Sequence, residues 1–377
     1  MGLRYLTRIR SASQNPSLDI IKDTGKSLRK FENPRSSKPF HIRLNEEVSD
    51  NSVKQQKVFE VGHQSVPPWL VPDVSCCSKD ISKKNQTEEE VKAKFLEHDV
   101  VHKDHIKLYT DGSKSEEGVG CAAIHENTSY VVKLPDSASI YTAELTAVIN
   151  ALDRVYHSEG KDFVIYSDSK STIESLKLFN SFHPLIQKAQ EWLFRISGRH
   201  KLVHFCWIPS HVGIQGNEIA DREAKEAIHS ELCIIKKVPP SDMKKPIRSY
   251  VLKKWEERWL SPLLLNNKKY RNLRESITPW PSSFNSNRRT KIVLSQLRIG
   301  HSRLTHKYIL EGSSPPECLY CDCRQSIEHL LVQCPRYNTL RRKHSLHNKA
   351  MRDILNDEVD VCSLMAFLKE INIFNKI

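Results

Sequence analysis

The sequence predicts an α/β protein in which helices cover both faces of a mixed five-stranded sheet, followed by a smaller, mostly helical region. Two observations lead to this fold class. Three short strand-like runs stand close together between residues 106 and 134, and runs of helical and strand spacing then alternate up to residue 228. A meander followed by alternating helices and strands is typical of a mixed sheet. Beyond residue 230, helical spacing dominates.

The expected elements follow from the spacing of the apolar residues and from the turn residues between the runs. The run at 140–157 repeats Leu145, Val148, Ile149 and Leu152 along one helical face. Strands are expected at 106–110, 118–125, 129–134, 163–167 and 202–208. Helices are expected at 140–157, 171–178, 184–196 and 218–228, the last of them capped by Asn217.

Three regions differ in composition. Residues 1–100 are polar and irregular and are predicted to form a connector without a catalytic group. Residues 103–230 carry the α/β pattern, and residues 231–377 are predicted to form a basic helical tail with a Cys/His cluster at 318–334.

The connector is expected to end in one helix. Thr87 and Glu90 have the spacing of a capping box, in which each side chain accepts a hydrogen bond from the backbone of the other residue. The helix that follows is expected to place Val91, Phe95 and Leu96 on one face.

The positive charge of the chain is concentrated in one segment. The net charge is +13, from 58 Lys+Arg and 45 Asp+Glu, and residues 231–310 hold 18 of the basic and 5 of the acidic residues. A basic segment beside a near-neutral domain favours contact with a polyanion, most simply nucleic acid. A solvated linker explains the same charge, and the charge alone does not separate the two interpretations.

The sequence excludes several classes of protein. No run approaches the roughly 20 apolar residues that span a bilayer, and residues 1–10 lack the apolar core of a secretory signal. We therefore expect an intracellular protein, nuclear or cytoplasmic, that does not engage a membrane. Its ten cysteines are expected to be thiols or metal ligands rather than disulfides.

Four carboxylates stand where predicted elements begin or end. Asp111 ends the first strand, Asp168 ends the fourth, and Glu144 and Asp221 lie in the first turns of two helices. Each alone could be a turn former or cap. Four together at one sheet edge would repel one another, and a bound hard cation is the usual solution. Two divalent ions about 4 Å apart serve displacement at phosphorus.

The segments around these carboxylates resemble the type 1 ribonuclease H domain. Four motifs agree in order and spacing over about 125 residues: Tyr-Thr-Asp-Gly-Ser at 109–113, Thr-Ala-Glu-Leu at 142–145, Tyr-Ser-Asp-Ser at 166–169, and the run from His211 to Asp221. The resemblance implies a ribonuclease H-like fold and endonucleolytic hydrolysis of the RNA strand of RNA–DNA hybrids. The products would carry a 3′-hydroxyl and a 5′-phosphate.

The resemblance also implies roles for individual residues. Asp111, Glu144, Asp168 and Asp221 would hold two Mg²⁺ ions, with Mn²⁺ as a substitute. His211, on a loop with Gly213 and Gly216, would assist proton transfer and product release, which suits a group with a pKa near ~6.5. An exposed loop histidine without a role is the other interpretation. Contacts to the RNA 2′-hydroxyl are expected from backbone groups near Gly112, Ser113 and Glu144. The residues expected to bind substrate are Gly112, Ser113, Ser169 and Asn217.

The tail holds three cysteines and a histidine within seventeen residues, namely Cys318, Cys321, His329 and Cys334. This set suits a tetrahedral structural zinc site. Cys323 is a rival to Cys321, and a set of unrelated free cysteines is the alternative.

The order of segments resembles the C-terminal part of arthropod non-long-terminal-repeat retrotransposon polyproteins. Those place a ribonuclease H domain after a reverse transcriptase and end in a segment like residues 297–301 followed by a Cys-Cys-His-Cys cluster. The Pro67-Pro68-Trp69 stretch is also similar to theirs, and no Tyr-x-Asp-Asp polymerase motif is present. The resemblance implies that residues 1–100 are a remnant after a missing reverse transcriptase, and that a reverse transcriptase in trans is a possible partner.

Two other functions compete with the metal-dependent ribonuclease. The chain could be a catalytically idle nucleic-acid-binding remnant, although all four carboxylates are intact. It could also be a transposase or integrase of the same superfamily, which the run from His211 to Asp221 fits poorly.

Overall fold

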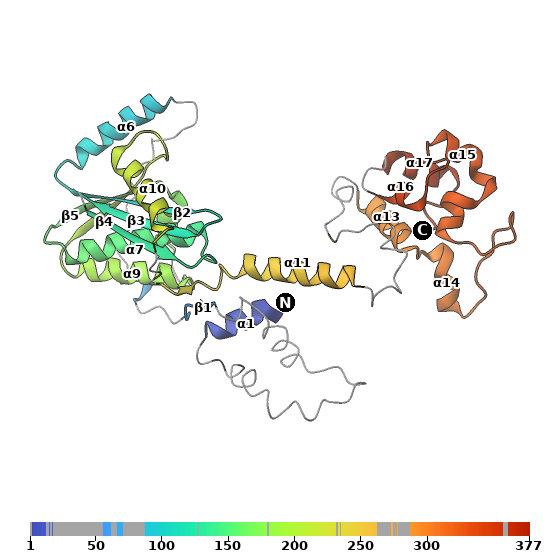
Figure 1. Cartoon of the computed structure of the whole chain (residues 1–377), viewed down its shortest axis with the longest axis horizontal. Coiled ribbons are helices and arrows are strands. Elements are labelled where there is room, and N and C mark those ends of the chain that lie inside the picture. The colour runs from blue at the N-terminus through green and yellow to red at the C-terminus, as the bar shows by residue number, and fades with distance from the viewer. Residues whose placement is uncertain are drawn as a thin grey trace. The chain divides into compact units, whose positions relative to one another are not determined.

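The computed structural model divides into two compact units, Met1–Arg248 and Ser249–Ile377, and each is described by itself (Figure 1). The predicted boundary at residue 230 lies inside the first unit, and the boundary between folding units stays a prediction. The structure describes residues 2–12, 15, 17, 56–61, 66–70, 87–126, 128–178, 181–230, 233, 235–261, 273, 277, 287–356 and 361–377.

A five-stranded mixed sheet forms the centre of the first unit, with the strand order β4-β3-β2-β5-β6. The strands are β2 (Ile106–Lys114), β3 (Val119–His125), β4 (Thr128–Leu134), β5 (Asp162–Ser167) and β6 (Leu202–Trp207). β2, β3 and β4 form an antiparallel meander, whereas β5 pairs in parallel with both β2 and β6. The predicted α/β fold with a mixed five-stranded sheet is confirmed.

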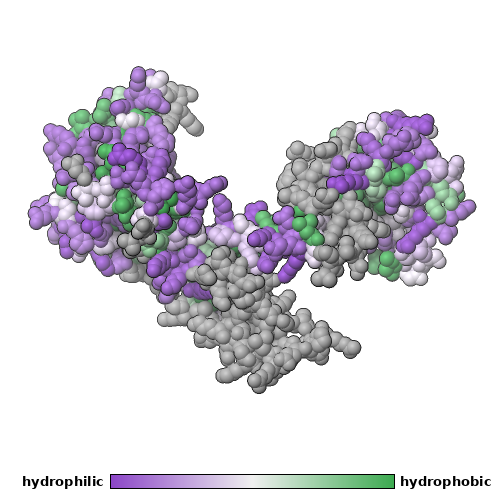
Figure 2. Space-filling view, viewed as in Figure 1, coloured by the Kyte–Doolittle hydropathy of each residue, from purple (hydrophilic) through white to green (hydrophobic). Residues whose placement is uncertain are grey.

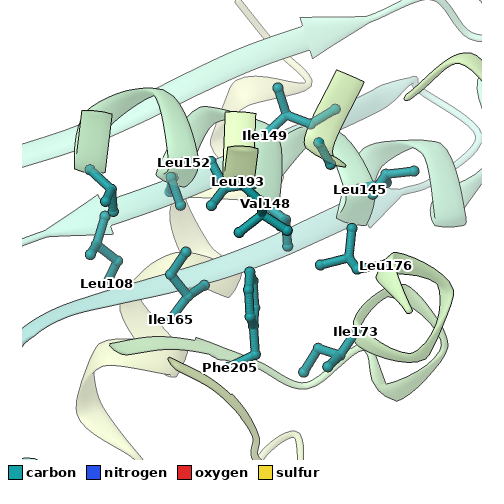
Figure 3. Close-up of a cluster of buried hydrophobic side chains, with 14 of the residues drawn as sticks. Leu108, Leu145, Val148, Ile149, Leu152, Ile165, Ile173, Leu176, Leu193 and Phe205 are labelled. Atoms are coloured by element: carbon teal, nitrogen blue, oxygen red, sulfur yellow. The ribbon is translucent and has the colours of Figure 1, made fainter. Parts of the chain in front are cut away.

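Helices pack on both faces of this sheet, and the alternation of strand residues explains how. Leu108, Ile165 and Phe205 point to the face covered by α7, α8 and α9, as Figure 3 shows for this cluster. The next residue along β6, Cys206, points to the opposite face, which α6 and α10 cover. The helices are α6 (Glu88–Val101), α7 (Ile140–His157), α8 (Lys170–Leu176), α9 (Pro184–Ser197) and α10 (Gln215–Ala227).

The capping box of Thr87 and Glu90 is present at the start of α6. Val91 and Phe95 are buried as expected, but Leu96 is 53% exposed. The buried face of α6 therefore follows Val91 and Phe95 along the helix and turns Leu96 towards solvent.

Two predicted boundaries were wrong, and both corrections concern the site. β2 does not end before Asp111: it continues to Lys114, because its antiparallel pairing with β3 extends beyond its parallel pairing with β5, which stops at Thr110. α10 begins at Gln215 with Ile214 as its N-cap, so Asn217 lies inside the first turn and does not cap the helix.

Segments outside the α/β pattern also belong to the first unit. α1 (Gly2–Arg10) and the short helical turn η2 (Pro68–Leu70) lie in the predicted connector. β1 (Lys57–Val58) pairs in parallel with β7 (Lys237–Val238), which lies beyond the predicted boundary at residue 230. The helix α11 (Lys244–Leu260) follows β7 in the chain, and the division between the two units falls within it, after Arg248.

The second unit is helical, as predicted, with Val293, Leu331 and Phe367 among its fully buried core residues. Its elements are α13 (Arg288–Ile299), α14 (Arg303–Glu311), the π-helical turn η5 (His329–Gln333), the 3-10 turn η6 (Pro335–Tyr337), α15 (Asn338–Lys343), α16 (Met351–Leu355) and α17 (Val361–Glu370). Hydrophilic side chains dominate the visible described surface of both units (Figure 2). Among the described residues, no helix combines the length and apolar character needed to cross a bilayer.

Candidate active site

Three of the four predicted carboxylates meet in the first unit. Asp111 comes from the middle of β2, Glu144 from α7, and Asp168 from the turn that follows β5. One carboxylate oxygen of each residue lies within 4.8 Å of the others. Asp111 and Glu144 are only 5% and 8% exposed, so water screens their charges poorly.

Gly112 explains how α7 comes so close to β2. A Cβ atom on Gly112 would lie 2.6 Å from the backbone nitrogen of Glu144 and 2.9 Å from the side chain of Ala143. Any larger residue would therefore push α7 away from the strand. The backbone N–H of Gly112 also donates to the carboxylates of both Asp111 and Glu144.

Burial and mutual repulsion hold protons on this cluster. Burial, followed by the charges of Asp168 and Asp221, raises the pKa of Asp111 to about 8. Burial, followed by the charges of Asp111 and Asp168, raises the pKa of Glu144 to about 9. The pKa of Asp168 is raised as well, again chiefly by burial.

The same residues fit a divalent cation. The donor set consists of carboxylate oxygens, which Mg²⁺ prefers. Glu144 Oε2 is buried and has no hydrogen-bond partner among the described residues, so it is available as a ligand. A cation bound between the three carboxylates would relieve the repulsion that raises their pKa values.

Asp221 lies near this group but outside the three-residue cluster. Its carboxylate accepts a hydrogen bond from Lys225 Nζ at 2.7 Å, one turn further along α10. Its charge still contributes to the raised pKa of Asp111.

Gly216 sets the position of α10, because a Cβ there would lie 2.3 Å from the ring of Tyr109. Gly216 is therefore a packing residue of α10 and not part of the loop.

His211 is exposed on the loop before α10, with a positive backbone φ of 55°. It forms a second group with Glu218 and Asp221, whose ligand atoms lie within 4.8 Å of one another. A positive charge on His211 would lower the pKa of Asp168. The His211 side chain therefore lies close to Asp168 as well as to Asp221.

Sequence reasoning missed Glu218. Its Oε1 accepts a hydrogen bond from the backbone N–H of Gly213 at 3.3 Å and so links the loop to the helix. The available signal was its position one helical turn before Asp221, which places both on one face of α10.

The four residues expected to contact substrate lie in different settings. Gly112 and Ser113 lie in β2 beside Asp111. Ser169 is the N-cap of α8, and its hydroxyl bonds that of Thr172 at 2.8 Å. Asn217 is 2% exposed, and its side chain hydrogen-bonds the Asp168 carboxylate and lowers the pKa of that group. Asn217 therefore has a positioning role in the structure, and the substrate contacts stay a prediction.

Asp242 is a second residue that sequence reasoning missed. It is 8% exposed and lies near the start of α7, the helix that carries Glu144. Its carboxylate accepts hydrogen bonds from Ser139 N at 2.9 Å, Ser139 Oγ at 3.0 Å and Thr142 Oγ1 at 2.7 Å. No local motif marks it, because Ser139 lies 103 residues away in the chain.

The predicted Cys/His cluster also comes together. Ligand atoms of Cys318, Cys321, His329 and Cys334 lie within 4.8 Å of one another. Cys334 Sγ is 3.9 Å from Cys318 Sγ and 3.8 Å from Cys321 Sγ. Hydrogen bonds from the Tyr320 backbone and from His329 lower the pKa of Cys318, which favours the thiolate form that binds metal. The exposed rival Cys323 lies 3.4 Å from His329 Nδ1.

Known proteins match the part of the chain that holds the carboxylates. The family model described as RNase H matches residues 103–229. The Pol polyprotein of equine infectious anemia virus, strain Wyoming, is 34% identical over 128 residues. The Pol polyproteins of isolates 1369 and CL22 of the same virus are each 33% identical over the same length.

These matches cover 32% of this chain and 10% of each viral polyprotein. The chain therefore spans a small part of the relatives that it matches. Three findings concern the same segment, residues 103–229. They are the order of the strands in the sheet, the short distances among Asp111, Glu144 and Asp168, and the match to the family model. Residues 103–229 of this chain form a ribonuclease H domain, a member of the RNase H family.

Proposed function

We propose that the first unit hydrolyses the RNA strand of RNA–DNA hybrids and leaves a 3′-hydroxyl and a 5′-phosphate. Asp111, Glu144, Asp168 and Asp221 would hold two Mg²⁺ ions, or Mn²⁺ in their place. The observation that carries this proposal is the convergence of three carboxylate oxygens within 4.8 Å in a buried position, because that arrangement is costly without a cation.

When bound, two divalent cations supply Lewis acidity for in-line displacement at phosphorus, both for the attacking water and for the leaving oxygen. The residues of the chain hold this site in shape. Gly112 donates its N–H to Asp111 and Glu144, and Asn217 holds Asp168. His211 can take up and release a proton at the exposed side of the site, close to Asp221.

A cleavage assay with a labelled RNA–DNA hybrid, with and without Mg²⁺, tests the proposal. The full chain should cleave the RNA strand when Mg²⁺ is present, and Asp111→Asn and Asp168→Asn should each abolish cleavage while the chain stays folded. Asp162→Asn is the matched control, because Asp162 is exposed at the opposite end of the strand that leads to Asp168.

Full activity of Asp111→Asn would contradict the assignment of the carboxylates. A chain that binds the hybrid but does not cleave it under any of these conditions would instead be the idle nucleic-acid-binding remnant.

We further propose that the second unit holds a structural Zn²⁺ through Cys318, Cys321, His329 and Cys334. The short distances among the sulfur atoms and the buried position of His329 support this set. The excess of basic residues at 231–310 would bind nucleic acid. A retroelement origin, with a reverse transcriptase acting in trans, is part of the same proposal.

A further inference from the structure

A cluster of imidazoles and one thiol lies between α6 and the edge strand β6, on the sheet face away from α7. The buried face of α6 carries Val91, Phe95 and His98, and His102 follows as the C-cap residue of the helix. Across from these, β6 presents His204 and Cys206, which share one face of the strand. None of these side chains belongs to the carboxylate site or to the Cys/His cluster of the second unit.

The cluster is tightly packed. Ligand atoms of His98, His102 and Cys206 lie within 4.8 Å of one another. Cys206 Sγ is 4.0 Å from His102 Nε2, and the ring centroids of His98 and His102 are 5.1 Å apart. His105 and His204 complete the surroundings, with ring centroids 4.7 Å and 5.5 Å from that of His102.

Apolar packing alone does not explain this composition. A neutral imidazole brings one donor and one acceptor nitrogen, and each needs a partner when it is buried. The Nδ1 atom of His105 is buried and has no hydrogen-bond partner among the described residues. His102 and Cys206 are 5% and 1% exposed, so little water reaches the centre of the cluster.

Two nitrogen ligands and one sulfur ligand are a set that zinc accepts, with Zn–N near 2.0–2.1 Å and Zn–S near 2.3 Å. These bond lengths place ligand atoms roughly 3.3–3.8 Å apart in a tetrahedron. The 4.0 Å between Cys206 Sγ and His102 Nε2 exceeds that range slightly. Small side-chain rotations would bring these ligand atoms to the distances that a bound zinc ion needs. His98 in the last turn of α6 and His102 at its C-cap are four residues apart, and their ligand atoms lie within 4.8 Å, close enough for two imidazoles to share one ion.

We propose that His98, His102 and Cys206 form a second transition-metal site, which zinc would occupy and which fastens α6 to β6. His105, whose buried Nδ1 has no hydrogen-bond partner among the described residues, lies beside His102. This site lies outside the residues that would hold Mg²⁺ and does not depend on the nuclease proposal.

Counting zinc in four versions of the full chain tests this inference separately from the zinc proposed in the second unit. Wild type, Cys206→Ala, Cys334→Ala and the double variant are purified with zinc, dialysed against excess Mg²⁺ to keep the carboxylates occupied, and analysed for metal. The wild type should hold two zinc ions per chain. Cys206→Ala and Cys334→Ala should each hold one, and the double variant none. Cys121→Ala is the matched control, because Cys121 is a buried thiol of the same sheet outside the cluster, and it should keep two.

Co²⁺ substitution gives a readout that does not depend on stability. In the Cys334→Ala background, Co²⁺ should give a thiolate-to-cobalt absorption band, and this band should disappear in His98→Ala, whose side chain is only partly buried. The exposed His157→Ala should retain the band. Equal zinc contents in wild type and Cys206→Ala, or a band unchanged in His98→Ala, would overturn the second site, whatever the outcome for the nuclease or for the second unit.

Discussion

At the scale of single residues, the ribonuclease H domain places repelling groups together and holds them with specific neighbours. Gly112 admits α7 to within contact of β2 and donates to two of the carboxylates. Asn217 holds the third, and Trp207 Nε1 donates to the backbone carbonyl of Asp168 at 2.9 Å. The carboxyl groups therefore lie in fixed positions before any cation binds, which is the preorganisation that a metal site needs.

His211→Ala is expected to lower the turnover of hybrid cleavage by about 10²-fold, because a proton shuttle assists the reaction but does not hold the ions. Steady-state rates of hybrid cleavage over a range of pH measure the effect. Exposed His200→Ala serves as the control. A loss as complete as that of Asp111→Asn would mean that the role of His211 is misassigned.

The raised pKa values predict how the metal-free protein responds to pH. An unfolded Asp or Glu loses its proton near about pH 4, whereas Asp111 and Glu144 keep theirs in the folded chain up to about pH 8 and 9. The folded state therefore binds more protons, and stability should fall as pH rises between these limits.

Asp111→Asn should remove part of the loss of stability that occurs as the pH rises. It should stabilise the Mg²⁺-free chain at high pH by roughly 1–3 kcal/mol, since one pKa unit corresponds to about 1.4 kcal/mol. Urea unfolding at both ends of the pH range measures it. Asp162→Asn should keep the wild-type slope. An Asp111→Asn chain that loses stability at high pH would show that the carboxylates do not repel one another in the folded state.

At the scale of elements, α7 depends on a residue from a distant segment. Ser139 caps the helix, and the carboxylate of Asp242 accepts hydrogen bonds from Ser139 and from Thr142. A negative charge at a helix N-terminus is favourable, and here the charge is also buried. The segment after β7 thus supports the helix that presents Glu144.

Asp242→Ala is expected to destabilise the first unit by about 1–3 kcal/mol, because it leaves the buried hydroxyl of Thr142 and the half-buried hydroxyl of Ser139 without a charged acceptor. Cleavage should fall together with the order of α7, while Asp242→Asn should keep more of both. Thermal unfolding and hydrogen exchange of α7 amides measure this. The exposed Asp104→Ala is the control, and equal stability of the two alanine variants would contradict the capping role.

At the scale of the whole molecule, the structure shows where the chain can be shortened. A chain that ends after Ser261 keeps β7 and Asp242, whereas one that ends after Ser230 loses both. We expect the longer piece to cleave hybrids at close to the full rate. The shorter piece keeps all four carboxylates and should still cleave, but more slowly and with lower stability. Equal stability of the two pieces would show that β7 and Asp242 add nothing to the first unit.

We expect the second unit to change the affinity of the chain for the RNA–DNA hybrid rather than the rate of the cleavage step. If its basic residues contact phosphates, removing the unit should weaken binding to the hybrid and reduce the dependence of affinity on salt. If zinc ties its Cys/His cluster, Cys334→Ala in the full chain should unfold this unit, while the hybrid cleavage carried out by the first unit is kept. An unchanged salt slope, or a second unit that stays folded in Cys334→Ala, would contradict these roles.

The sequence by itself determined the sheet and helix pattern of residues 103–230, because apolar periodicity and local caps fix individual elements. The motifs also predicted that Asp111, Glu144, Asp168 and Asp221 come together, and the structure brings the first three within 4.8 Å and leaves Asp221 in a second group with His211 and Glu218. Only the tertiary structure decided that β2 runs on past Asp111, because that depends on how far β3 remains paired after β5 has ended.

Long-range contacts could not be predicted from the sequence either, because they depend on residues that lie far apart in the chain. Asp242 caps a helix that lies far away in the chain, and the cluster of His98, His102 and Cys206 joins a helix to a strand about a hundred residues later. Nothing in the local sequence around either group records its partner. Periodicity determines which face of an element is buried, but the packing of distant elements decides which polar groups on those faces come into contact.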